Sequence, residues 1–439
     1  GIISMNMDGG RKAASIVRVV SLVVVGMVLA PPPVLGQSVG SLQKQIKKLQ
    51  NALDAVKKQL NQVQKEQSRQ KTQMARQKKE IAPLQKTVKR LSKVSISGGA
   101  TGIIQGTFGV PSREGGDDTF AGGSFDLIFE YNPMKDWKVV LDLEAIGGNG
   151  PEQNFTTLHG LNGDLGTTND NVTILEAYLE GVLFNKRLTL SAGKIDATNY
   201  IDGNAYGGDE TSQFLSSGFL NNSVFSAPGN GPGVRARLDL ISDRFYLEVV
   251  GMSQDPNNDT NTTDRIFEDV FGAVEVGVTP KLFGRPGNYR LWGTFDGAGS
   301  RIKKSTGRAE NYTAMGVGLS FDQEVAKGLG LFFRLGYRDS QNTAYTTRSA
   351  WSIGAQLNVG QFVQARPKDV IGIAWGEISP TKRDFGRRAT EEDLVEAYYN
   401  WFFTDNFQLS GIFQFINNRN GNSSLSDVTV VGARVQANF

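Results

Sequence analysis

The sequence predicts an all-β fold: a 16-stranded antiparallel transmembrane β-barrel with an N-terminal α-helical coiled-coil stalk. Three observations support this prediction. The spacing of apolar residues changes from 3.5 to 2 after Val94, the strand count is even with alternating short and long connections, and aromatic residues lie beside the short connections. We expect three parts: a signal peptide at 1–36, a stalk at 37–94 and the barrel at 95–439.

Composition excludes several classes of chemistry. The chain has 439 residues, no Cys and a single His, His159, so disulfides, thiol nucleophiles and His-based metal or catalytic clusters are not expected. The formal net charge of +3 is unevenly distributed: residues 1–36 carry +2, residues 37–94 carry +12 and the remainder carries −11. We therefore expect no metal, no cofactor and no enzymatic activity, and no nucleic acid as a partner.

Residues 1–36 have the pattern of a targeting segment. Basic residues Arg11, Lys12 and Arg18 precede an apolar run at 19–30, and prolines 31–33 lead into a small-residue exit ending at Gly36. The apolar run is too short to span a bilayer comfortably, which favours a cleaved secretory signal over a membrane anchor.

Residues 42–91 form a heptad repeat. Apolar residues occupy the a positions Ile46, Leu53, Leu60, Met74, Ile81 and Val88 and the d positions Leu49, Val56, Val63 and Leu84. So narrow an apolar strip is buried only against another helix, so we expect a homo-oligomer through the coiled coil. Pro83 should kink or end the helix. The basic charge predicts contact with an anionic polymer such as the cell wall, or a merely solvated helix face.

Sixteen strand candidates follow, with alternating apolar and polar residues. They begin near residues 96, 123, 137, 172, 187, 233, 244, 269, 289, 311, 328, 346, 369, 392, 407 and 428. On the last, Val431, Val435 and Phe439 share one face, and Arg434 and Gln436 share the other. A soluble sandwich alternates in the same way, so the surrounding solvent must be inferred from other features.

The connections supply those features. Residues 109–122, 147–170, 195–232 and 254–266 are long loops, whereas 132–136, 184–186, 241–243 and 285–288 are short turns. The aromatic residues beside the short turns are Trp137, Phe184, Phe245, Tyr289, Trp401, Phe403 and Phe407. Short turns on one rim and aromatic girdles are typical of outer-membrane barrels. We expect the outer membrane of a Gram-negative-type bacterium, with lipid outside and the stalk in the periplasm.

The polar faces then line the lumen. Its expected carboxylates are Asp126, Glu130, Asp142, Glu144, Glu176, Glu180 and Glu396, and its expected guanidiniums are Arg235, Arg237, Arg290, Arg334, Arg338 and Arg434. In a ring of sixteen strands the third faces the eleventh, so Arg334 and Arg338 oppose the acids across the water. Tyr178, Tyr246, Trp292, Phe332 and Tyr398 are interleaved with these charges. A sugar ring stacks on aromatic planes while its hydroxyls bind charged groups.

The connection from about 195 to 232 is the longest. A barrel of this width leaves an aqueous channel unless a loop folds into it, so we expect this loop to form the constriction. It carries the carboxylates Asp196, Asp202, Asp209 and Glu210. Residues 209–212 can begin a short helix, because acidic residues suit a helix N-terminus.

Several runs resemble the OprB-type carbohydrate-selective porins. They are 193–198, 208–215, 228–233, 283–290, 336–340, 351–354, 396–400 and 435–439. The resemblance covers roughly 95–439 and implies a sixteen-stranded channel for monosaccharides, with an arginine-rich eyelet and loop carboxylates that contact the sugar. It assigns these roles to Arg235, Arg237, Arg334, Arg338, Asp209 and Glu210. The stalk departs from the simplest family members.

The expected function is therefore passive diffusion of small carbohydrates through a charged, loop-constricted channel. A general or ion-selective porin is the first alternative, since a shared scaffold does not fix selectivity. A cell-wall tether through the basic coiled coil is the second. Paired carboxylates can also indicate a glycosidase, but here they recur on many strands as a wall does.

Overall fold

The computed structural model describes residues 39–165, 171–241, 244–254, 266–302, 308–339, 345–381 and 389–439. The expected signal peptide lies outside these residues. The chain divides into two compact units, one up to Lys89 and one from Arg90 onward. Each unit is described by itself.

The described residues of the first unit belong to one long helix, α2 (Val39–Leu91), of 53 residues, which ends two residues beyond the unit. Of the two effects expected of Pro83, a kink or an end, the end does not occur: the helix continues to Leu91, although proline has no N–H to donate to it. The apolar heptad positions are about half exposed, for example Ile46 at 53% and Leu53 at 55%. None of the helices in the described residues has the length and apolar character needed to cross a bilayer.

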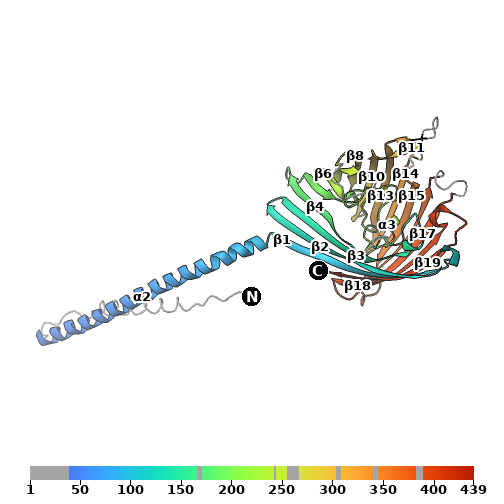
Figure 1. Cartoon of the computed structure of the whole chain (residues 1–439). Helices are drawn as coiled ribbons and strands as arrows, with labels where there is room; N and C mark the ends of the chain where they lie inside the picture. Colours follow the sequence, from blue (N-terminus) through green and yellow to red (C-terminus); the bar gives the residue numbers. More distant parts are fainter. Residues whose placement is uncertain are drawn as a thin grey trace. The chain divides into compact units, whose positions relative to one another are not determined.

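The second unit is a closed antiparallel barrel, which confirms the predicted architecture (Figure 1). In the described residues its sixteen wall strands are β1 (Val94–Phe108), β2 (Thr119–Met134), β3 (Trp137–Gly148), β4 (Asn171–Leu183), β5 (Leu188–Ile195), β6 (Gly231–Ile241), β7 (Phe245–Gln254), β8 (Asp269–Val278), β10 (Arg285–Asp296), β13 (Ala314–Ala326), β14 (Leu329–Arg338), β15 (Thr347–Asn358), β16 (Val370–Pro380), β17 (Glu392–Phe402), β18 (Phe407–Asn417) and β19 (Val428–Asn438). Closure occurs where β1 pairs with β19, for example at Gly102 and Val435. Three shorter strands, β9 (Lys281–Leu282), β11 (Ser300–Ile302) and β12 (Ala309–Asn311), lie in connections.

The two faces of the wall differ as the alternation predicts. On β14 the apolar side chains of Leu331, Leu335 and Tyr337 are 41–54% exposed, whereas Arg334 and Arg338 are 0–3% exposed. Side chains of successive strand residues point to opposite faces, so the apolar set faces outward and the charged set inward. An apolar exterior is the surface that the hydrocarbon of a bilayer solvates.

Short turns gather at one rim and long loops at the other. The turn before β10 is tighter than predicted: residues 285–288, expected in the turn, belong to β10, and residues 285–286 pair with β9. Phe283 and Gly284 alone make the reversal with positive φ of 52° and 77°, as a two-residue hairpin requires. Aromatic side chains flank these turns; Phe403, for example, lies 5.1 Å from Trp401 and 5.6 Å from Phe407, measured between ring centroids.

Two long loops fold inward and fill part of the barrel. We call residues 196–230, between β5 and β6, the inner loop, and the described residues 149–165, after β3, the second loop. The inner loop contains the short helix α3 (Ser217–Leu220), which lies inside the barrel and contacts β16 (Figure 1). Phe214 and Phe219 of this loop are fully buried, and Phe214 packs edge-on against the wall residue Tyr398 at 5.0 Å. The apolar core of the barrel therefore lies between the loops and the wall.

Candidate functional site

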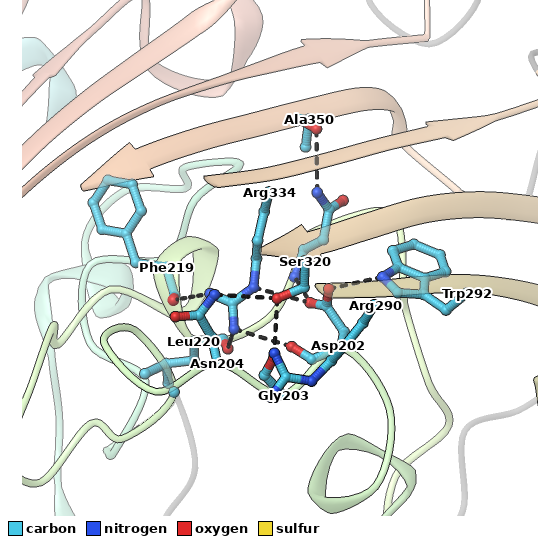
Figure 2. Close-up of polar contacts among 12 residues, drawn as sticks. Asp202, Gly203, Asn204, Phe219, Leu220, Arg290, Trp292, Ser320, Arg334 and Ala350 are labelled. Atoms are coloured by element: carbon cyan, nitrogen blue, oxygen red, sulfur yellow. Dashed lines mark hydrogen bonds and ion pairs between the residues drawn. The ribbon is translucent and has the colours of Figure 1, made fainter. Parts of the chain in front are cut away.

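Arg334 of β14 holds the middle of the inner loop (Figure 2). Its Nη atoms donate hydrogen bonds to the carbonyls of Phe219 (2.7 Å), Leu220 (2.8 Å) and Asp202 (3.0 Å). Its Nε lies 3.3 Å from the Asp202 carboxylate, and both side chains are fully buried. The pair joins two separate stretches of the loop, 202 and 219–220, to one strand.

Asp202 is the second half of this anchor. It has a positive φ of 62°, a conformation that Asp tolerates better than most side chains. Its carboxylate accepts hydrogen bonds from Trp292 Nε1 (2.7 Å) and the Asn222 amide (2.6 Å). Its own amide donates to Glu275 at 2.7 Å. A buried carboxylate that is paired and hydrogen-bonded on every side is stable only while all its partners stay in place.

Two further arginines bind the loop through its backbone. Arg338 donates to the carbonyl of Val224, and Arg434 of β19 donates to the carbonyls of Glu210 and Gln213, the latter at 3.0 Å. The Asp209 carboxylate accepts from the Thr211 amide at 2.9 Å, which produces a turn and not the expected helix. Helix α3 begins later, at Ser217, because the Ser216 side chain caps its N-terminus.

Wall carboxylates bind loop amides in the same manner. Glu396 of β17 accepts from the amides of Leu215 (2.5 Å) and Ser216 (3.0 Å). Glu392, also on β17, accepts from the His159 amide (2.7 Å) and lies 2.8 Å from its Nδ1. The second loop is therefore also fixed to the wall, and the only histidine of the chain serves this purpose.

Several residues expected to face open water are covered by these loops. Arg334, Arg338, Arg434, Glu396, Trp292 and Tyr398 are at most 3% exposed. The expected transverse field from Arg334 and Arg338 fails for this reason, because their guanidiniums are used to hold backbone carbonyls. Glu176 has a similar use: it accepts from the Asp196 amide at 2.9 Å.

The remaining charges form a ladder along the inner face of β2–β13. Lys138 lies 3.4 Å from both Glu130 and Glu180, and Arg235 lies 3.4 Å from Glu180 and also contacts Glu248. The ladder continues with Arg237 at 3.2 Å from Glu248, and then with Arg290, 4.0 Å from Glu275 and 2.7 Å from Asp322. The guanidinium of Arg237 also lies 3.8 Å from the ring centre of Tyr246. Acids and bases alternate, so this strip is electrically compensated.

A neighbouring group of carboxylates lacks such compensation. Asp126 of β2 and Glu144 of β3 are directly opposite in the sheet register. Burial, together with the charges of Asp209, Asp164 and Asp126, raises the pKa of Glu210 in the inner loop to about 7. Burial also raises the pKa of Asp164, although a hydrogen bond from Ser124 (2.8 Å) and the charge of Arg434 oppose it. We call Asp126, Asp142, Glu144, Asp164 and Glu210 the acidic face.

The interior thus has two unlike sides. Inward side chains of β13–β19 are mostly buried, as Ser320 (0%), Ala374 (2%) and Gln414 (0%) illustrate; we call this side the closed wall. On β2, β3, β4 and β6, which we call the open wall, many inward side chains remain partly exposed; they include Asp126, Ile128, Glu144, Glu180, Arg235 and Arg237. The partly exposed polar side chains of the interior therefore lie mainly on the open wall.

Sequence reasoning missed several residues of this interior. Glu248 and Glu275 lie opposite each other on β7 and β8, and Asp322 lies on β13. Their alternation with apolar neighbours along each strand indicates that they face inward. Asp164 and Glu392 carried none, because their partners come from segments distant in sequence. Within the described residues, no group of His, Asp or Glu side chains has an arrangement that fits a metal ion.

Comparisons with known proteins agree with this architecture. Residues 134–439 match the family model described as carbohydrate-selective porin, OprB family. A high-pH structure of OprB from Pseudomonas putida superposes with a TM-score of 0.67 at 17% identity, covering 80% of this chain and 96% of that chain. OpdL from Pseudomonas aeruginosa gives 0.50 at 11% identity, covering 80% and 99%. At such identities the structural likeness establishes the fold alone.

One relative in sequence is an uncharacterized protein from Aquifex aeolicus strain VF5. It is 25% identical over 244 residues, which is 56% of this chain. The match spans 63% of that relative's own length.

Proposed function

Because this chain belongs to the carbohydrate-selective porin family OprB, whose members are outer-membrane channels and not enzymes, we propose that it passes small neutral sugars by passive diffusion. Monosaccharides are the proposed solutes. The proposal places the route between the inner loop and the open wall. The charge ladder and the acidic face supply donors and acceptors for sugar hydroxyls along this route.

The observation that carries the proposal is the fixed position of the inner loop. Three arginines and Glu396 bind its backbone to the closed wall, which leaves polar side chains accessible on the opposite side. A loop held by buried charges cannot shift without leaving a charge unpaired, and such a rearrangement costs several kcal/mol. A constriction of constant size follows, and constant size is what discrimination by solute volume requires.

Liposome swelling with a panel of sugars, amino acids and salts tests the proposal. Reconstituted protein should admit monosaccharides faster than disaccharides, and faster than amino acids of similar size. Liposomes without protein provide the baseline. Equal rates for sugars, amino acids and salts of one size would contradict sugar selectivity.

An ion-selective porin is the second candidate, favoured by the uncompensated carboxylates of the acidic face. Reversal potentials in a salt gradient separate the two candidates. Strong ion selectivity, together with single-channel currents that sugars never reduce, would favour this alternative and contradict sugar binding in the channel.

For α2 we propose self-association through the heptad seam, with the helix in the periplasm. The support is the exposure of its apolar positions: Leu42, Leu49 and Leu60 are 50–56% exposed. Such a strip in water is stable when it packs against the same strip of another copy. Cross-linking of the full chain should give oligomers that disappear on deletion of 42–81. Oligomers that survive the deletion would contradict the proposal.

The basic charge of the same segment supports a further proposal, contact with an anionic cell-wall polymer. Residues 42–91 bind purified wall material in this proposal, and sugar uptake does not depend on them. Co-sedimentation of the full chain and of the deletion variant with isolated cell wall tests it. Equal sedimentation of the two would contradict a tether.

A further inference from the structure

The register of the barrel places like charges directly opposite each other in two places on the open wall. Asp126 faces Glu144 across β2 and β3, and Asp142 faces Glu176 across β3 and β4. Directly opposed residues of neighbouring strands have Cβ atoms about 4.5–5.5 Å apart, and like charges at that separation are destabilising. The arrangement therefore weakens the sheet unless a proton or another positively charged group neutralises one carboxylate of each pair.

Elsewhere in the same barrel an opposed pair of acids is neutralised by the protein. Glu248 faces Glu275, but Arg235 and Arg237 bind the first and Arg290 lies near the second. In the described part of the chain, no Lys or Arg forms an ion pair with the five residues of the acidic face. The nearest base, Arg434, directs its donors to loop carbonyls and wall side chains.

A second observation points to a ligand. Asp142 is 9% exposed and its Oδ1 has no hydrogen-bond partner, and Asp164 is 8% exposed and its Oδ2 has none. An unpaired buried carboxylate oxygen is costly, because it has lost water without gaining a donor. These two oxygens belong to the acidic face. Its other members Asp126 and Glu144 lie on the more accessible side. These oxygens can accept hydrogen bonds, and a donor that also carries positive charge would compensate the net negative charge of the acidic face.

The geometry also limits what that partner is. No set of carboxylates in the described residues converges as a metal ion requires. A primary ammonium group offers three donors and one charge without strict coordination geometry. Resting on the proposed function, we propose that the acidic face selects amino sugars, whose ring resembles that of a neutral sugar and whose ammonium group supplies the missing charge.

The test compares three labelled sugars entering proteoliposomes: glucose, glucosamine and its neutral analogue N-acetylglucosamine. In a water-like dielectric, each carboxylate about 6 Å from the ammonium group raises the local concentration of the amino sugar about threefold. The wild type should take up glucosamine severalfold faster than glucose. In the double variant Asp126→Asn with Glu144→Gln, the glucosamine rate should fall about tenfold and the glucose rate should change less than about twofold.

Two controls keep the test independent of folding defects. The matched double variant Asp126→Glu with Glu144→Asp keeps both charges and should retain the glucosamine preference. For the wild type alone, raising salt from about 10 mM to about 1 M shortens the Debye length from about 30 Å to about 3 Å and should remove most of the preference.

Failure of the inference and failure of the proposed function give different results. If glucose enters but glucosamine enters no faster than N-acetylglucosamine, and salt has no effect, the inference is overturned and the proposed function stands. If no sugar enters although ions pass, both are overturned.

Discussion

The open wall and the closed wall of this barrel use the same residue types for opposite purposes. On the closed wall, Arg334 and Arg434 are fully buried and bind loop carbonyls. On the open wall, Arg235 and Arg237 bind carboxylates and remain partly exposed. Guanidinium groups thus hold the inner loop on one side and, in the proposed function, contact the solute route on the other. Which role an arginine has is decided by whether a loop covers it.

This difference has an energetic basis. Removing one partner of a buried ion pair strongly destabilises the folded protein, because the other charge stays buried and uncompensated. A partly exposed pair, such as Lys138 with Glu130 on the open wall, contributes little, since water solvates either partner. Substitutions on the closed wall should therefore change the loop and the channel size, and substitutions on the open wall should change selectivity.

The largest effect is expected for Arg334→Ala. It leaves Asp202 buried without its partner, at a cost of about 3–5 kcal/mol, so the inner loop should leave the closed wall. Single-channel conductance should rise and disaccharides should enter. The double variant Arg334→Met with Asp202→Asn removes both charges and should recover most of the wild-type conductance. Unchanged conductance in Arg334→Ala would show that the loop is held by other contacts.

On the open wall, Arg235→Ala should weaken sugar binding without enlarging the channel. Hydrogen bonds to charged groups contribute about 1.5–3 kcal/mol, so the sugar concentration that half-blocks the current should rise about tenfold. Noise analysis of sugar-induced block measures it. Arg338→Ala is the comparison from the closed wall. An equal loss of sugar binding in both variants would argue against two distinct walls.

A third prediction concerns pH. The pKa of Glu210 lies at about 7, above its ordinary 4.5, so the carboxyl is neutral in acid and becomes charged as pH rises through 7. The preference for cations over anions should therefore increase about threefold between pH 5.5 and 8.5. Glu210→Gln should reduce this step, as reversal potentials will report. A step of equal size in Glu210→Gln would assign the titration to another group.

The same pKa shift affects stability. The folded state holds the Glu210 proton more tightly than the unfolded chain does, so this contribution to stability is complete below about pH 4.5 and is lost as pH rises through about 7. In thermal unfolding, Glu210→Gln should lose less stability than the wild type as pH rises from about 4.5 to about 7.

The smallest effect is expected for Lys138→Met. Its pairs with Glu130 and Glu180 are partly exposed, so the loss of stability should stay under about 1 kcal/mol. Two carboxylates are nevertheless released, which should raise cation preference slightly. Arg113→Met removes a similarly exposed pair in the loop after β1 and should leave selectivity unchanged.

The sequence predicts the wall well and the interior poorly, for a physical reason. Strand alternation is local, so the sixteen strands and the inward orientation of Arg334 follow from period 2. Whether Arg334 meets water or Phe219 depends on a loop more than 100 residues away in sequence. Similarly, Asp202 was one of four loop carboxylates, of which the resemblance gave a role only to Asp209 and Glu210, and only its contacts with Trp292 and Arg334 distinguish it.

The most direct test of the two-wall account uses the absence of cysteine from the chain. Ile128→Cys introduces a thiol on the inward face of the open wall, and Ile412→Cys introduces one on the inward face of the closed wall, where Ile412 is 3% exposed. Each variant is treated with a charged, water-soluble thiol reagent, and glucose uptake into proteoliposomes is measured. The account predicts that Ile128→Cys loses most of its uptake and Ile412→Cys none. Loss of uptake at Ile412→Cys, with Ile128→Cys unaffected, would contradict it.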